Sequence, residues 1–278
     1  MKKFGEILRK TRKDIGITQM YLANKTIDRT TISKIESGME EPYYENGVAL
    51  IHNLGISMDE FEYIRRGYMW SSKEKLIYEF MMLSYSTQED LINQLLVKLD
   101  LFDKDLDISR IKLILQAFKS INEHDGDITL AKKIVQPIWF DFLAQVDNWK
   151  ILDLYILNKI FFIFDEDVME MITNKAIKII ENHYPFLKEL ETSFILNRSR
   201  IRMNSHNVVA ALRDLAVGEK LAQEVYQYDK LLVAKCRIAI CKNDKLTAEY
   251  YASLASQIGA KEIALSLKDE IFKFILDN

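Results

Sequence analysis

The sequence predicts an all-α protein with two parts, a small N-terminal domain and a longer array of helical hairpins. Only 9 of the 278 residues are Gly and 3 are Pro, too few for the turns of a β-rich protein. Apolar residues recur at helical spacing along almost the whole chain. Turn or cap signals also recur about every 40 residues, an interval that fits two helices; they lie at Thr87, Asp127, Asp165, Ser205 and Asp244.

Composition excludes several classes of protein. Hydrophobic residues make up 49% of the chain and charged residues 28%, which is typical of a folded domain and not of a disordered one. Two cysteines cannot form a disulfide framework. No segment resembles a signal peptide or reaches the roughly 18 apolar residues of a membrane helix. We therefore expect a cytoplasmic protein that does not interact with membranes.

Five short helices are expected in residues 1–66. Thr18 and Asp28 are favourable N-caps for the second and third helices, and Gly38 ends the third. Pro42 is expected to open the fourth. Ser57 starts a capping box for the fifth.

Residues 67–71 are predicted to be a linker, and residues 72–278 a tetratricopeptide-like superhelix. Stacked hairpins bury the apolar face that one hairpin alone leaves exposed. Trp149, Leu152 and Ile156 open one hairpin with a spacing typical of tetratricopeptide repeats. We expect about five hairpins, closed by a cap helix from Lys261 to Leu276.

The second and third helices have the spacing of a helix-turn-helix, whose second helix enters the major groove. Residues 1–39 carry nine Lys or Arg against four Asp or Glu, whereas the whole chain has a net charge of −3; this asymmetry favours a polyanionic partner. A merely solvated helical bundle is the alternative. The residues predicted to contact double-stranded DNA are Thr18 and Gln19, at a phosphate, and Arg29, Thr30, Ser33 and Lys34, at base edges.

Two family resemblances follow from these residues. The elements Thr18-Gln19-x-x-Leu22-Ala23 and Ile32-x-x-Ile35-Glu36-x-Gly38 resemble the Xre-type helix-turn-helix of phage repressors. With Val146-Asp147-Asn148-Trp149 and Phe194-Ile195-Leu196-Asn197, the whole chain resembles the Rgg/GadR/MutR regulators. That resemblance implies a transcription factor that forms a homodimer and senses a short signalling peptide, as in quorum sensing.

The implied peptide site lies on the concave side of the repeats, where asparagine amides can bond an extended backbone. We expect a short, mainly apolar peptide, and a dimer interface within Tyr228 to Leu276. The alternative is that each asparagine is simply solvated. The predicted peptide-binding residues are Trp149, Tyr155, Asn158, Asn197 and Arg200.

No motif indicates an enzyme, a metal site or a cofactor. The sequence contains no GxGxxG, Walker or GxSxG motif, and Cys236 and Cys241 lack a zinc-site spacing. The alternatives to a peptide-controlled regulator are a prophage-type repressor of related architecture and an interaction scaffold that does not bind DNA.

Overall fold

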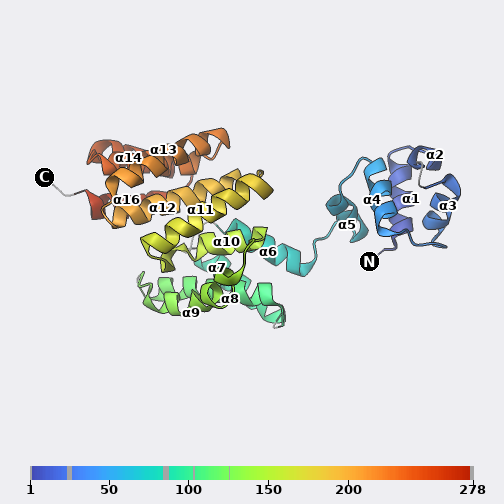
Figure 1. Ribbon diagram of the computed structural model, residues 1–278, viewed down its shortest axis with the longest axis horizontal. Coiled ribbons are helices and arrows are strands. Elements are labelled where there is room, and N and C mark those ends of the chain that lie inside the picture. Colours follow the sequence, from blue (N-terminus) through green and yellow to red (C-terminus); the bar gives the residue numbers. More distant parts are fainter. Residues whose placement is uncertain (1, 24–26, 84–87, 103, 125, 276–278) are drawn as a thin grey trace. The chain divides into compact units, whose positions relative to one another are not determined.

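The computed structural model describes residues 2–23, 27–83, 88–102, 104–124 and 126–275. The chain is 77% helical, and no strand occurs in the described ranges. It divides into two compact units, Met1–Lys75 and Leu76–Asn278, both shown in Figure 1. The all-α prediction is confirmed. The linker predicted at residues 67–71 stays a prediction.

The first unit contains the five predicted helices. Three predicted N-caps are confirmed, because the side chains of Thr18, Asp28 and Ser57 accept hydrogen bonds from the backbone N–H of Tyr21, Thr31 and Glu60 at 3.2, 2.8 and 3.1 Å. The helices are α1 (Phe4–Asp14), α2 (Gln19–Leu22), α3 (Arg29–Ser37), α4 (Tyr44–Asn53) and α5 (Met58–Arg65). The fourth begins at Tyr44, two residues after the expected Pro42.

The core of this unit depends on one close approach between α1 and α3. Ile7, Leu8, Ile32 and Ile35 are each at most 1% exposed. A Cβ atom on Gly5 would lie only 1.8 Å from the backbone oxygen of Ile35. Only glycine allows the two helix backbones to come this close.

The second unit is a stack of helical hairpins. Its helices are α6 (Ser72–Met82), which begins in the first unit, α7 (Glu89–Leu99), α8 (Leu106–Glu123), α9 (Thr129–Phe140), α10 (Ile151–Lys159), α11 (Glu166–His183), α12 (Lys188–Asn204), α13 (Val208–Glu224), α14 (Tyr228–Cys241), α15 (Lys245–Gln257) and α16 (Lys261–Phe274). Short 3₁₀ turns follow α7, α9 and α10 at Asp100–Phe102, Leu143–Gln145 and Phe161–Ile163. Within the described ranges, the ten helices α6 to α15 match the expected number of about five hairpins, and α16 is the cap. The two helices of a hairpin pack together for α8 with α9, α12 with α13 and α14 with α15; Leu276 lies outside those ranges.

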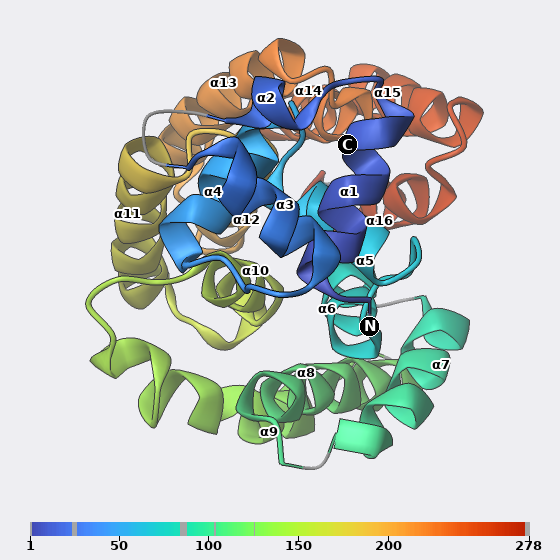
Figure 2. The ribbon, with the colours of Figure 1, turned by 90° about the vertical axis from the view of Figure 1, so that its right-hand side faces the viewer.

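The stacking places alternate helices side by side. From α11 onward each helix packs against the next, and α10, α12, α14 and α16 also pack successively against one another. In Figure 2 these helices follow an arc, with α10 and α12 on its inner side and α11 and α13 on its outer side. We call the exposed side of α10, α12 and α14 the inner face.

The predicted period is confirmed at the turns that the structure describes. Asp165 and Asp244 cap α11 and α15, Asp127 accepts hydrogen bonds from Thr129, and Ser205 ends α12. Thr87 lies outside the described residues. None of the helices in the described ranges is long and apolar enough to span a bilayer.

Candidate functional site

The third helix presents the predicted DNA-reading residues on a single exposed side. Arg29, Thr30, Ser33 and Lys34 are all exposed, whereas Ile32 and Ile35 are buried in the core. This separation follows from the helical period, because buried Ile32 and Ile35 are three positions apart and share one face of α3, whereas Ser33 and Lys34 between them turn outward. The arrangement leaves four hydrogen-bonding side chains free to meet a nucleic-acid groove.

A buried ion pair holds this helix in place. Glu36 of α3 accepts bonds from Arg12 of α1, Nε to Oε1 at 2.6 Å and Nη2 to Oε2 at 2.9 Å. Gln19 of α2 adds a third bond at 2.9 Å, and Arg12 also donates to the carbonyl of Ile17 at 2.8 Å. The network therefore joins all three helices of the helix-turn-helix region. Sequence analysis missed it, although Arg and Glu on apolar helices offered a signal.

This network limits what Gln19 can do. Its side-chain nitrogen already donates to Glu36, so its role within the unit is to position α2 against α3. Thr18 is exposed, but its hydroxyl oxygen caps α2. Contact of these two residues with a phosphate stays a prediction that rests on their backbone N–H groups.

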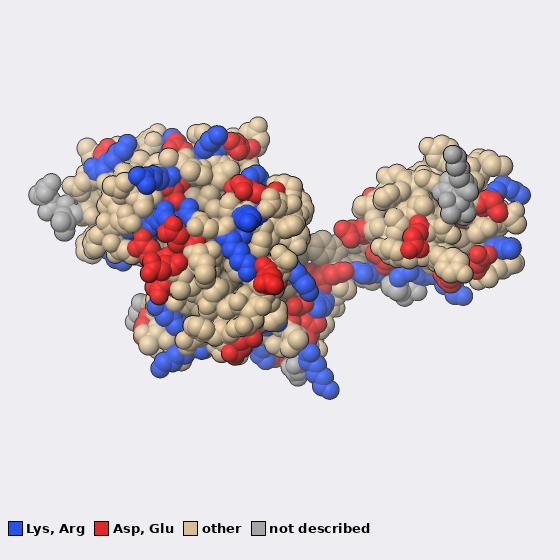
Figure 3. All heavy atoms as spheres, viewed as in Figure 1, with Lys and Arg blue, Asp and Glu red and all other residues tan. Residues whose placement is uncertain are grey.

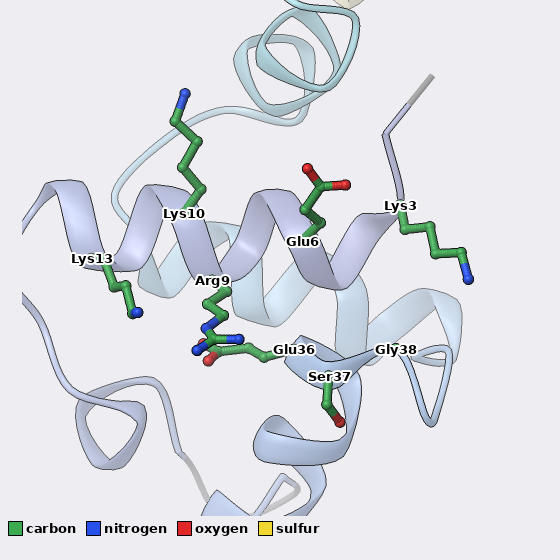
Figure 4. Close-up of a pocket in the computed structure, with 8 residues that line it drawn as sticks. All are labelled: Lys3, Glu6, Arg9, Lys10, Lys13, Glu36, Ser37 and Gly38. Atoms are coloured by element: carbon green, nitrogen blue, oxygen red, sulfur yellow. The ribbon is translucent and has the colours of Figure 1, made fainter.

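Basic side chains also gather on α1. A shallow depression of about 460 Å³ is bordered by α1 and by the end of α3 (Figure 4). Arg9 extends toward Glu36 there, and Lys3, Lys10 and Lys13 of the same segment also border the depression, with Lys10 pointing away from Glu36. Figure 3 shows both signs of charge interspersed over the second unit on the face in view. The basic character of residues 1–39 thus lies partly on α1, beside the C-terminal end of α3.

On the inner face, two of the predicted peptide-binding residues meet. Asn197 Nδ2 of α12 donates to Asn158 Oδ1 of α10 at 3.0 Å, across 39 residues of sequence. Both are half-buried, as is Tyr155, one helical turn from Asn158. Each amide keeps its other polar atom for a further bond, one donor and one acceptor.

The other two predicted peptide-binding residues differ from expectation in their surroundings. Trp149 is 2% exposed and donates from Nε1 to the carbonyl of Leu143 at 3.0 Å. It packs in the core before α10 begins and has no face accessible to a peptide, so the proposed site does not include it. Arg200 is half-exposed and pairs with Glu270 of α16 at 3.2 Å.

Two lysines that the sequence did not single out lie on two helices of the repeats, α10 and α14. Lys159 of α10 donates to the backbone carbonyl of Leu83, and its ammonium lies 5.2 Å from the ring centroid of Phe80. Lys230 of α14 donates to the Glu189 carbonyl at 2.8 Å and to Ser193 Oγ at 2.5 Å. Burial lowers the pKa of each lysine to about 8, and the charge of Lys230 contributes to the lowering at Lys159.

Comparison with known proteins supports the two-part description. Residues 8–61 match the helix-turn-helix family model, while none of the curated proteins matches the chain. A protein from Listeria monocytogenes EGD-e, described as a candidate transcriptional regulator, has a similar structure with a TM-score of 0.72 at 18% identity, covering 98% of this chain and 97% of that one.

Two further structures are similar over nearly their whole length. The SHP pheromone receptor Rgg2 of Streptococcus dysgalactiae gives a TM-score of 0.70 at 18% identity and covers 98% of this chain and 100% of its own. ComR from S. thermophilus, solved with DNA and its signalling peptide ComS, gives 0.63 at 15% identity, with coverage of 99% and 100%. The chain therefore carries a helix-turn-helix domain and has, along almost its full length, the fold of Rgg-type regulators.

Proposed function

We propose that this protein is a sequence-specific DNA-binding transcriptional regulator, controlled by a short linear peptide that binds the inner face of its repeats. The observation that carries the proposal is the exposed polar side of α3, held to α1 and α2 by the buried Arg12–Glu36–Gln19 network. A helix that merely covers a core needs no such fixed orientation. DNA recognition does, because base contacts require precise placement of side chains.

The proposal extends to location, chemistry and assembly. The protein acts in the cytoplasm, where its DNA is, and has no enzymatic activity. Residues 1–66 bind DNA, residues 67–71 link the domains, and residues 72–278 bind the peptide and dimerise. Two copies then present two α3 helices to half-sites about one helical turn apart.

DNA binding is tested by selecting binding sites from a random duplex library with the full-length protein. Arg29→Ala is expected to lose sequence preference at one base pair and to cost about 1–3 kcal/mol of binding, whereas Lys34→Ala weakens all duplexes alike if it contacts phosphate. Arg213→Ala, an exposed residue of α13, serves as the control. Unchanged affinity and preference in Arg29→Ala would refute the assignment of α3, and failure of the wild type to select any site would favour a scaffold.

The peptide arm uses a pooled library of random octapeptides, selected on the full-length protein. Asn158→Ala and Asn197→Ala are each expected to weaken the selected peptide by about 1–3 kcal/mol, because a buried peptide group loses its partner. The matched control is Asn93→Ala on the exposed side of α7. Wild-type affinity in both variants would place the peptide elsewhere.

Dimerisation is proposed to involve the last helices, α15 and α16. Phe272 is 86% exposed and Leu246 81%, and Phe272 borders a depression between α15 and α16. Both lie in the segment predicted to form the dimer interface, and exposed apolar side chains that adjoin one another can mark an interaction surface. Light scattering is expected to show a dimer that Phe272→Asp converts to a monomer, while Phe186→Asp, at a residue 70% exposed on the loop before α12, leaves it intact.

A further inference from the structure

Four cations of the first unit lie beside the C-terminal end of α3. Lys3, Arg9, Lys10 and Lys13 border the depression of about 460 Å³, and all four are exposed. They share one side of α1, because positions three, four and seven apart lie on the same helix face. Among the residues that the structure describes, none of the four forms an ion pair or a side-chain hydrogen bond. Their charged groups are therefore available to a ligand.

The acids at the depression do not neutralise these cations. Arg9 extends toward Glu36 (Figure 4), yet both carboxylate oxygens of Glu36 are already bonded, Oε1 to Arg12 Nε and Oε2 to Arg12 Nη2 and Gln19. The buried Arg12 thus matches the charge of Glu36. Glu6 is the other acid that borders the depression. One uncommitted carboxylate therefore faces four cations, which favours an anion from outside the chain.

The depression adjoins the side of α3 that is proposed to contact bases. Ser33 belongs to that side, and Ser37 lies four positions further along the same helix. Residues four positions apart lie on the same face of a helix, and Ser37 is exposed and borders the depression. The hydroxyl of Ser37 donates to the carbonyl of Lys34 at 2.9 Å. The free donors at this end of α3 therefore come from α1.

Two of the four cations point in the direction of α3. Figure 4 shows Arg9 and Lys13 extending from α1 on the side of α3, and Lys10 extending on the opposite side. A helix that lies in the major groove has a phosphate strand on either side of it, and about half to two-thirds of the hydrogen bonds in protein–DNA complexes go to phosphate or sugar. Cations that flank the end of the helix are suited to such a strand.

We infer that Arg9 and Lys13 of α1 bind phosphates of the DNA strand that passes the C-terminal end of α3. The inference rests on the proposed function and adds two positioning residues that lie outside the helix-turn-helix. Charge-assisted bonds to phosphate are among the stronger hydrogen bonds, and an arginine donates two of them in a fixed geometry.

The packing of the first unit gives these contacts a consequence. The backbones of α1 and α3 approach closely at Gly5, and the Arg12–Glu36 pair joins the same two helices. Because the two helices are held together in this way, fixing α1 on the phosphates also fixes the angle at which α3 enters the groove. Phosphate contacts orient a protein on the duplex without reading its sequence.

The test is the salt dependence of binding, measured with the full-length protein and a duplex that it selects from the random library. The slope of log K against log salt concentration falls by about 0.9 for each phosphate contact that is lost. We expect Arg9→Gln and Lys13→Gln each to reduce the slope by that amount and to bind about 3- to 10-fold more weakly at physiological salt. The selected sequence should stay the same, in contrast to Arg29→Ala.

Lys10→Gln is the matched control, because it removes the same charge from the same helix on the side that points away from α3. Its slope is expected to equal that of the wild type. Glutamine has nearly the helix propensity of lysine and arginine, and all three side chains are exposed, so the variants should fold. Circular dichroism checks this.

Several results would overturn the inference, and they are distinguishable. A wild-type slope in both Arg9→Gln and Lys13→Gln refutes the phosphate contacts but leaves DNA binding intact. An equal reduction in Lys10→Gln shows that the cations act only through the net charge. Binding of inorganic phosphate that Arg9→Gln abolishes, with unchanged binding of the duplex, assigns the depression to a small ligand. Selection of no duplex by the wild type refutes the proposed function together with the inference.

Discussion

Each unit contains one buried Arg–Glu pair that joins three helices, and the two pairs differ in their third member. In the first unit Arg12 and Glu36 are joined by Gln19, a neutral residue. In the second unit Arg237 bonds Glu270 through two contacts of 2.8 Å, and the third member is Arg200, a cation. The first network is neutral and the second carries a surplus positive charge.

This difference separates two ways of building a binding surface. In the helix-turn-helix unit the network only supports α3, and Arg29 and its exposed neighbours have no part in it. On the repeats, half-exposed Arg200 and the paired asparagines belong both to the packing between helices and to the surface that we propose to bind the peptide. Stability and binding are therefore separable by mutation in the first unit and coupled in the second.

The largest expected effect comes from removing the acid of either pair. Glu36→Leu and Glu270→Leu each leave a buried arginine unpaired, which costs about 3–5 kcal/mol. Hydrogen exchange measured by mass spectrometry resolves the two units, and faster exchange is expected only in the unit that carries the change. Adding Arg12→Met or Arg237→Met should restore most of the loss, since an apolar pair replaces an ion pair at little cost. Unchanged exchange in both single variants would show that neither pair supports its unit.

The next largest effect concerns the approach of α1 to α3. Gly5→Ala places a Cβ atom against the Ile35 backbone and is expected to destabilise the first unit by about 3 kcal/mol. Gly47→Ala is the matched control, because its Cβ meets the Phe4 ring at 3.6 Å, an ordinary contact. That change should stabilise α4 by about 0.5–1 kcal/mol. Equal effects of the two substitutions on exchange in the first unit would argue against the close approach.

The pH dependence of the two units should diverge. Burial alone would raise the pKa of Glu36, but the bonds from Arg12 and Gln19 outweigh it and the pKa is lowered. The ionised Glu36 therefore stabilises the first unit above the unfolded pKa of 4.5. This stabilisation is lost as the pH falls through the pKa of Glu36 in the folded protein.

The two inner-face lysines should change the stability of the second unit in a different pH range, above pH 8. Their pKa of about 8 lies below the ordinary lysine value of 10.5, so the unfolded chain binds more protons between these values and stability rises with pH there. We expect a gain on the order of 2 kcal/mol for the second unit after allowance for solvent screening. Urea unfolding between pH 8 and 10.5 checks it; the gain should disappear in the Lys159→Met/Lys230→Met double variant, and its persistence there would contradict the assignment.

The smallest effect is expected at a turn of the repeats. Tyr226 follows α13 with a φ of 58°, in the left-handed region, where a side chain is disfavoured by about 1 kcal/mol. Tyr226→Gly should therefore stabilise the second unit by about that amount, measured by thermal unfolding. A loss of stability would mean that the tyrosine ring, although 75% exposed, makes a compensating contact.

Much of the fold was determined by short-range patterns. Thr18, Asp28 and Asp244 cap helices as expected, because a cap depends on bonds to residues three positions away. The exposed side of α3 follows from the helical period. Asn158 and Asn197 are 39 residues apart, close to the predicted period of about 40, and they bond each other.

Tertiary structure alone decided the polar contacts of the interior. Trp149 has the spacing of a repeat residue, yet it lies in the core and bonds Leu143, because its surroundings are set by the packing of α9 against the turn that follows it. The Arg12–Glu36 pair and the partners of Lys159 depend on which helices meet at which height. A charge becomes buried and paired only through atoms distant in sequence, so its environment, its pKa and its role appear only when the helices are assembled.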